Sequence, residues 1–215
     1  MISARDIIAK RVAKELQPGN LVNLGIGLPT LVANHLDPDF EVYFQSENGL
    51  IGLGPHDENN IDPDLSNAGG EPVTLLKHGM FFDSALSFSI IRGGHVDITV
   101  LGALEVDKEG SLASWIVPGK MVPGMGGAMD LVTGAKKVII AMTHTNKGIP
   151  KIKENCSFPL TAYKVVDMIV TEYGVIEVKE DGLHLVERHE DVSIEEIIKS
   201  TEVNLIINDV KIMEV

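Results

Sequence analysis

The sequence predicts an α/β protein with an open, mostly parallel sheet flanked by helices and an antiparallel C-terminal portion. Two patterns in the 215 residues predict this class. Over most of the chain, short apolar segments typical of strands alternate with segments of helical periodicity, which favours a parallel sheet covered by helices. Beyond Pro159, short apolar segments follow one another and are separated by glycine, as in antiparallel strands. The length fits one domain, which we expect to span residues 1–215.

The chain begins with a predicted helix. Ser3 and Asp6 have the spacing of a capping box, with Asp in place of the usual Glu. Apolar residues then recur at every fourth position as far as Leu16, and Pro18-Gly19 ends the pattern. This N-terminus is amphipathic and does not have the pattern of a signal peptide.

A strand, a glycine turn and a helix are predicted next. Residues 21–24 are apolar and lead into Gly25-Ile26-Gly27, and residues 31–36 have a helical pattern. Residues 41–45 alternate as a second strand. The segment 55–71 is rich in Asp, Asn, Pro and Gly, so we expect a long surface loop that contributes to a lid.

The second half of the chain continues the alternation. A helical pattern over residues 81–91 ends at Gly93-Gly94, and branched apolar residues then predict a strand over 96–101. A continuous apolar run over 138–142 is typical of a strand that is covered on both faces. The remaining predicted elements are short strands over 168–170, 174–178 and 183–186 and a capped helix that begins after Ser193.

The composition excludes several classes of function. The formal net charge is −13, which argues against nonspecific binding to nucleic acid because such binding needs clustered Lys and Arg. No apolar run approaches the roughly 20 residues of a membrane-spanning helix. We therefore expect a cytoplasmic protein that binds neither nucleic acid nor membrane. Local backbone N–H groups in glycine-rich loops could still hold an anion.

The cysteine and histidine content gives no support for a metal site. Cys156 is the single cysteine, which excludes an internal disulfide and a multi-cysteine zinc site. We expect it to be a buried, unreactive thiol. The seven histidines contain no pair at metal-ligand spacing, so no bound metal is predicted.

The candidate reactive group is Glu47. It follows the predicted strand 41–45 and lies among small and turn-forming residues in the run 44–54. A carboxylate that is already ionised needs no neighbouring base to act as a nucleophile, only a nearby electrophile and some loss of water. The alternative is a solvated turn glutamate. Ser46 lacks the Gly-x-Ser-x-Gly setting of a serine hydrolase.

Two glycine-rich segments could hold an anionic ligand. Residues 118–130 contain four glycines and two prolines and lead into a helical segment. Their N–H groups could form an oxyanion hole or an anion cradle, and the alternative is a tight structural connection. The Gly25-Ile26-Gly27 turn lacks the third glycine of a dinucleotide site, and no Gly-Lys-Ser/Thr follows it, so a P-loop is also excluded.

Several of these segments together resemble one enzyme family. The sequence is similar to the B (beta) subunit of 3-oxoacid CoA-transferases over residues 3–178, and most similar to the acetate/butyrate–acetoacetate CoA-transferase B subunits. The segments that carry the resemblance are 23–29, Gln45-Ser46-Glu47-Asn48-Gly49, Phe82-Asp83-Ser84, 91–95, 115–121, 118–130 and 144–148.

The resemblance implies a fold, a reaction and a partner. The fold is the open α/β sheet shared with sugar-phosphate isomerases. CoA would be both substrate and covalent intermediate, with no permanently bound cofactor, and CoA would move between an acyl-CoA and a short-chain carboxylate. The partner would be a CoA-transferase A (alpha) subunit in an A2B2 heterotetramer. The Gly-Gly-Phe signature of that partner is absent from this chain, so the chain alone would be incomplete.

The resemblance also implies roles for individual residues. Glu47 would be the nucleophile that forms an acyl-glutamyl anhydride and then a glutamyl-CoA thioester. The other implied positions are oxyanion donors at Asn23, Gly126 and Gly127, motif support at Ser46, Asn48 and Gly49, and CoA approach at Gly25 and Gly27.

Two rival functions stay open from the sequence alone. A sugar-phosphate isomerase on the same fold would use Glu47 as a base and the glycine loops for phosphate. A ligand-sensing or scaffold subunit would share the fold without catalysis. The choice among acetate, butyrate, succinate and acetoacetate also stays open, since one methylene changes discrimination by only about 1 to 3 kcal/mol.

Overall fold

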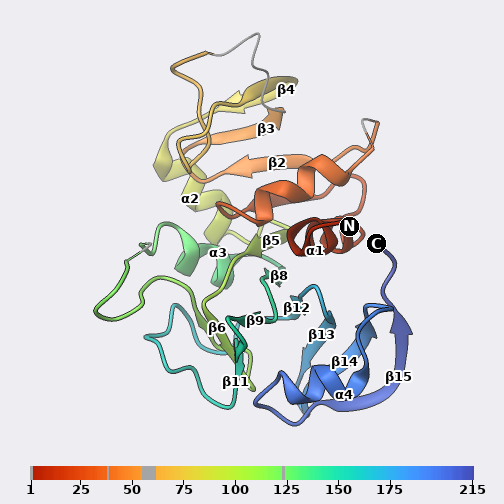
Figure 1. Ribbon diagram of the computed structural model, residues 1–215. Helices are drawn as coiled ribbons and strands as arrows, with labels where there is room; N and C mark the ends of the chain where they lie inside the picture. The colour runs from red at the N-terminus through yellow and green to blue at the C-terminus, as the bar shows by residue number, and fades with distance from the viewer. Residues whose placement is uncertain (1, 38, 55–61, 123) are drawn as a thin grey trace.

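One mixed sheet of ten strands organises the molecule (Figure 1). The computed structural model describes residues 2–37, 39–54, 62–122 and 124–215. In spatial order, the strands of the sheet are β15 (Ile206–Ile212), β14 (Gly182–Arg188), β13 (Gly174–Lys179), β12 (Met168–Val170), β8 (Lys137–Ala141), β5 (Ile98–Leu101), β1 (Leu21–Leu24), β2 (Tyr43–Ser46), β3 (Leu50–Gly54) and β4 (Thr74–Phe81).

The middle of the sheet is parallel and the flanks contain the antiparallel pairs. Strands β2, β1, β5, β8 and β12 pair in parallel, whereas β12–β13 and β13–β14 are antiparallel. The predicted α/β class and its antiparallel C-terminal portion are therefore confirmed. The structure adds an antiparallel β2–β3–β4 unit on the other flank and a parallel β14–β15 pair, neither of which we predicted.

Helices cover both faces of the sheet. The helices are α1 (Ala4–Ala13), a 3-10 helix η1 (Pro29–His35), α2 (Ser84–Arg92), α3 (Ala128–Gly134) and α4 (Ile194–Lys199). In Figure 1, α1 lies on the opposite side of the sheet from α2 and α3. Two small sheets complete the described structure: β6 (Glu105–Asp107), β7 (Leu112–Ala113) and β11 (Ile152–Lys153) in one, and β9 (Thr145–Asn146) and β10 (Ile149–Pro150) in the other.

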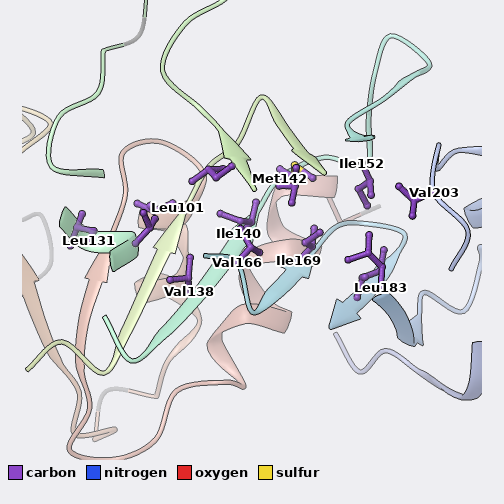
Figure 2. Close-up of a cluster of buried hydrophobic side chains, with 14 of the residues drawn as sticks. Leu101, Leu131, Val138, Ile140, Met142, Ile152, Val166, Ile169, Leu183 and Val203 are labelled. Carbon is purple, nitrogen blue, oxygen red and sulfur yellow. The ribbon is translucent and has the colours of Figure 1, made fainter. Parts of the chain in front are cut away.

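The apolar run of β8 supplies both halves of the core. Val138 and Ile140 pack in the cluster on the α2 and α3 side, shown in Figure 2, while Ile139 and Ala141 pack in the cluster against α1. Because successive side chains of a strand point to opposite faces, a central strand must be apolar throughout. The continuous apolar pattern was therefore a correct predictor of a strand covered on both faces.

Some predicted boundaries were wrong. The Ser3 side chain caps α1 as predicted by accepting from the Asp6 N–H, but the helix ends at Ala13, before Leu16. The predicted helix 81–91 begins at Ser84 instead, because Phe81 is the last residue of β4 and Asp83 is the helix cap. Strand β4 lies at the edge of the sheet with much of its surface exposed, so its sequence lacks the alternation that marks a half-buried strand.

The helix predicted over 31–36 is a 3-10 helix, Pro29–His35. Of the predicted loop over 55–71, residues 55–61 lie outside the described residues. Residues 62–71 contain turns and one isolated bridge between Ser66 and Pro72, in agreement with a loop. The lid role of this loop stays a prediction. Within the described ranges, no helix is long and apolar enough to cross a membrane.

Cys156 is half-buried, whereas we expected a buried thiol. Burial, followed by the nearby charges of Asp107 and Glu105, raises the pKa of its thiol to about 12. The sulfur therefore stays protonated at neutral pH, and a protonated thiol is a poor nucleophile. This supports the predicted low reactivity.

The buried His144 makes folding sensitive to acid. Its ring nitrogens lie 2.9 Å from the hydroxyls of Thr171 and Thr201, and burial lowers its pKa from 6.5 to about 4. Below pH 6.5 the unfolded chain therefore binds a proton that the folded chain does not. We expect up to about 3 kcal/mol of folding stability to be lost between pH 6.5 and 4.

Urea unfolding between pH 7 and 4.5 checks this expectation. The pH dependence of the unfolding free energy should flatten in His144→Gln. The glutamine amide has an oxygen and a nitrogen that can hydrogen-bond to the two threonines, but it does not titrate. It should persist in the control His78→Gln, because His78 is exposed. If the unfolding free energy changed equally with pH in the two variants, the assignment to His144 would be contradicted.

Candidate active site

Glu47 occupies a tight turn between two antiparallel strands. It is the first residue after β2, and Gly49 closes the turn by donating its N–H to the Ser46 carbonyl at 3.0 Å. Gly49 has a φ of +117°, and a Cβ there would lie 2.0 Å from the Phe82 carbonyl oxygen. Only glycine fits this position, so the last residue of the motif is required by the shape of the turn.

The glycine loop meets the Glu47 carboxylate directly. The Gly127 N–H donates to Glu47 Oε1, with 3.1 Å between nitrogen and oxygen. A Cβ on Gly127 would lie 3.0 to 3.2 Å from all three carboxylate atoms, and one on Gly126 would lie 3.4 Å from Oε1. The backbone of the loop therefore lies flat against the carboxylate. The structure brings together Glu47, Gly126 and Gly127, which the sequence had singled out separately.

Glu47 is half-buried, and the N–H that donates to its carboxylate belongs to Gly127, the N-terminal cap of α3. In this arrangement the Gly127 N–H binds the carboxylate itself. An oxyanion role would require the same N–H to transfer its hydrogen bond to a substrate oxygen. That role stays a prediction.

Asn23 lies behind the turn and is almost fully buried, at 2% exposure. Its Nδ2 donates to the backbone oxygen of Gln45 at 3.2 Å and to Gln45 Oε1 at 2.8 Å. Both amide hydrogens are therefore engaged within the protein, and the buried Oδ1 has no hydrogen-bond partner among the described residues. As an oxyanion donor, Asn23 would first have to release Gln45, so this role also stays a prediction.

The residues on either side of Glu47 hold a neighbouring loop. Ser46 Oγ accepts from the Ala68 N–H at 2.8 Å, and Asn48 Nδ2 donates to the Ser66 carbonyl at 2.8 Å. These two bonds attach the segment 62–72 to both ends of the reactive residue. The structure thus gives Ser46 and Asn48 a supporting contact, and it places part of the predicted surface loop beside the site.

The two glycines of the first turn differ from each other. Gly25 follows β1, and a Cβ there would lie 3.1 Å from the Val100 carbonyl oxygen and 3.0 Å from Leu101. Packing against β5 is therefore a sufficient reason for glycine at this position. Gly27 has a φ of +91° and open space around its Cβ position, so a ligand has room to approach it. CoA binding at both glycines stays a prediction.

Gln45 and Ser87 also belong to this region, although the sequence alone assigned Gln45 no role within its motif and did not indicate Ser87. Gln45 Nε2 donates to Ser87 Oγ at 3.1 Å, and both residues are buried. The available signal was a polar residue at the end of a predicted strand, two residues before Glu47. In the described part of the chain, no three His, Cys, Asp or Glu side chains are grouped so that they could hold a metal ion.

A family model for coenzyme A transferase matches residues 5–200. The chain belongs to the coenzyme A transferase family. It is 54% identical over 209 residues to the beta subunit of the acetate CoA-transferase of Haemophilus influenzae, covering 97% of this chain and 94% of that protein. It is 51% identical over 200 residues to the B subunit of the succinyl-CoA:3-ketoacid coenzyme A transferase of Helicobacter pylori, covering 92% and 96%. The resemblance inferred from the motifs and the predicted enzyme class are thereby confirmed.

Other relatives are longer than this chain. The mitochondrial succinyl-CoA:3-ketoacid coenzyme A transferase 2A of Rattus norvegicus is 50% identical over 201 residues, which are 92% of this chain but 39% of that protein. The bacterial relatives are named as beta or B subunits, which implies a second kind of subunit.

Solved structures show the same fold. The acyl-CoA transferase YdiF of Escherichia coli O157:H7 superposes with a TM-score of 0.81 at 24% identity over 99% of this chain, which spans 43% of that protein chain. Glutaconate coenzyme A-transferase of Acidaminococcus fermentans gives a TM-score of 0.74 at 18% identity, covering 99% and 89%. The decarboxylase AibA/AibB gives 0.72 at 19% identity, covering 100% and 90%. Because a decarboxylase shares the fold, the fold alone does not decide the reaction.

Proposed function

We propose that this chain is the single-domain B subunit of a CoA-transferase that moves CoA between an acyl-CoA and a short-chain carboxylic acid. The acids in question are acetoacetate together with acetate, butyrate or succinate. The observation that carries the proposal is the half-buried Glu47 carboxylate held against the Gly127 N–H. The names of relatives about 50% identical to this chain support the substrate class.

The proposed reaction has two covalent stages. The Glu47 carboxylate attacks the thioester carbonyl of the acyl-CoA, CoA leaves as a thiolate, and an acyl-glutamyl anhydride remains. The thiolate then attacks the glutamyl carbonyl, which releases the first carboxylate and leaves a glutamyl-CoA thioester. The second acid repeats these steps in reverse, so no ATP is consumed and the kinetics are ping-pong.

The residues around Glu47 hold its carboxylate in position and exclude water from the site. The turn and the glycine loop hold the carboxylate in one orientation, and holding the reacting groups together can contribute about 7 to 11 kcal/mol in favourable cases. A half-buried site also limits hydrolysis of the anhydride. We assign the rest of the enclosure of the site to an A (alpha) subunit. The two kinds of subunit would form an A2B2 assembly in the cytoplasm. The greater length of the single-chain rat relative is compatible with this division of labour.

Intact-mass spectrometry tests the proposal. The chain is mixed with acetoacetyl-CoA and its complementary subunit, treated with borohydride, and digested for peptide mapping. We expect a CoA adduct, or its reduction product, on Glu47 and none on the Glu47→Gln control. An assembled complex that transfers CoA without any adduct on Glu47 would contradict the mechanism. An assembled complex that does not react with acyl-CoA at all would favour an isomerase or a sensor.

A further inference from the structure

A buried chain of amides connects the strand of Glu47 to helix α2. Asn23 donates to Gln45 Oε1 at 2.8 Å, and Gln45 Nε2 donates to Ser87 Oγ at 3.1 Å. The exposures of the three residues are 2%, 3% and 0%. Gln45, the middle member of this chain, lies on β2 two residues before Glu47.

A second contact attaches the far side of the same turn to the start of α2. The Phe82 N–H donates to the Gly49 carbonyl at 3.0 Å, and Asp83 then caps the helix by accepting from the Leu86 N–H. The Phe82-Asp83-Ser84 segment thereby gains a structural role. One end of the Glu47 turn is therefore linked to α2 by the Gln45–Ser87 hydrogen bond. The other end is linked by the Phe82–Gly49 hydrogen bond to the residue just before the α2 cap.

Helix α2 also packs against α3, the helix that follows the glycine loop. Gly134 of α3 lies so close to α2 that a Cβ there would be 2.2 Å from the Ile91 carbonyl oxygen, and Arg92 Nε lies 2.6 Å from Asp130 Oδ1. Gly127 is the N-terminal cap of α3. The Gly127 N–H and the Glu47 turn therefore belong to two segments that both contact α2 or the residues just before it.

We propose that Ser87 is a positioning residue that sets the alignment of Glu47 with the Gly127 N–H through Gln45. Ser87 Oγ is the acceptor for the buried Gln45 Nε2. An unpaired buried amide is costly, so loss of this acceptor favours a shift of the end of β2. Ser87 lies on α2, the helix against which α3 packs, so such a shift moves Glu47 relative to Gly127. The catalytic consequence rests on the proposed role of Glu47, but the geometric one does not.

Ser87→Ala and Ser89→Ala form a matched pair for the test. Both changes remove a hydroxyl from α2, but Ser89 is exposed and donates to the Ala85 carbonyl within the helix. Ser87→Cys serves as a second variant, because the thiol fills similar space and is a weak acceptor. It keeps the test available if the alanine variant does not fold.

One readout is the amide signal of Gly127 in the full chain. Labelling glycine with 15N and with 13C at the carbonyl selects the three Gly-Gly amides of the sequence, those of Gly70, Gly94 and Gly127. The Gly127 signal is identified by its shift in Glu47→Ala, where the acceptor is absent. We expect Ser87→Ala and Ser87→Cys to move this signal toward its Glu47→Ala position, and Ser89→Ala to leave it unchanged.

The second readout is steady-state kinetics of the assembled enzyme. We expect kcat to fall about tenfold in Ser87→Ala while KM for acyl-CoA changes less than about twofold, since remote CoA contacts are untouched. An unmoved Gly127 signal in folded Ser87 variants would overturn the positioning role, whatever the rate. A moved signal with unchanged kcat would support the positioning role and overturn the proposed function of Glu47.

Discussion

Replacing Glu47 with glutamine is expected to reduce CoA transfer by at least about a thousandfold, because the amide is not a nucleophile. Glutamine has nearly the same shape as glutamate, and its Oε1 can still accept from the Gly127 N–H. The turn also depends on Gly49 and not on residue 47, so folding should be unchanged. The measurement is the rate of CoA transfer by the assembled complex, with thermal unfolding as the check on folding.

Glu47→Asp provides the graded control. Aspartate keeps the charge but withdraws the carboxylate by about one bond length, and a displacement of about 1 Å can cost about a hundredfold in rate. We expect its activity to lie between those of the wild type and Glu47→Gln. Near-normal turnover by Glu47→Gln would rule out a covalent role for this residue.

Gly127→Ala is expected to lower kcat by about tenfold to a hundredfold, because the new methyl group displaces the Glu47 carboxylate. The Cβ would lie 3.0 Å from Glu47 Cδ and within 3.2 Å of both oxygens. The backbone itself accepts alanine, since Gly127 has a φ of −84° and a ψ of 8°. The loss should therefore appear in catalysis rather than in stability.

Gly102→Ala is the matched control for this substitution. Gly102 does not have a strained φ, and a Cβ there would meet nothing within 4 Å. The kcat and melting temperature of both variants are measured in the assembled complex. If Gly127→Ala had the same kcat as Gly102→Ala, contact between the loop and the carboxylate would not matter for the reaction.

Much of the fold was predictable because its signals are local. The Ser3 cap, the continuous apolar run of β8 and the Ser193 cap each depend on residues close in sequence, and each was found where it was predicted. Strand β4 was missed because an edge strand with an exposed surface has no apolar alternation. Its position depends on pairing with β3, which no local pattern encodes.

The glycines show the same division at the level of single residues. Glycine at position 25 suggested ligand approach, yet the structure places its Cα against β5, where packing is a sufficient reason for it. Glycine at position 49 is required by a positive φ and by a carbonyl group 33 residues later in the chain, at Phe82. The composition of a loop thus predicts that the backbone has a special conformation, but not which neighbour requires it.

The sequence by itself determined the α/β class, the family resemblance and the choice of Glu47, because these depend on periodicity, caps and a short contiguous motif. The tertiary structure decided that the Gly127 N–H binds Glu47, although the two residues are 80 positions apart, and that Ser87 receives Gln45. Such contacts arise where parallel strands end beside helices that return from distant parts of the chain. A hydrogen bond of about 3 Å depends on the packing of all of these elements together, so no local pattern in the sequence could predict it.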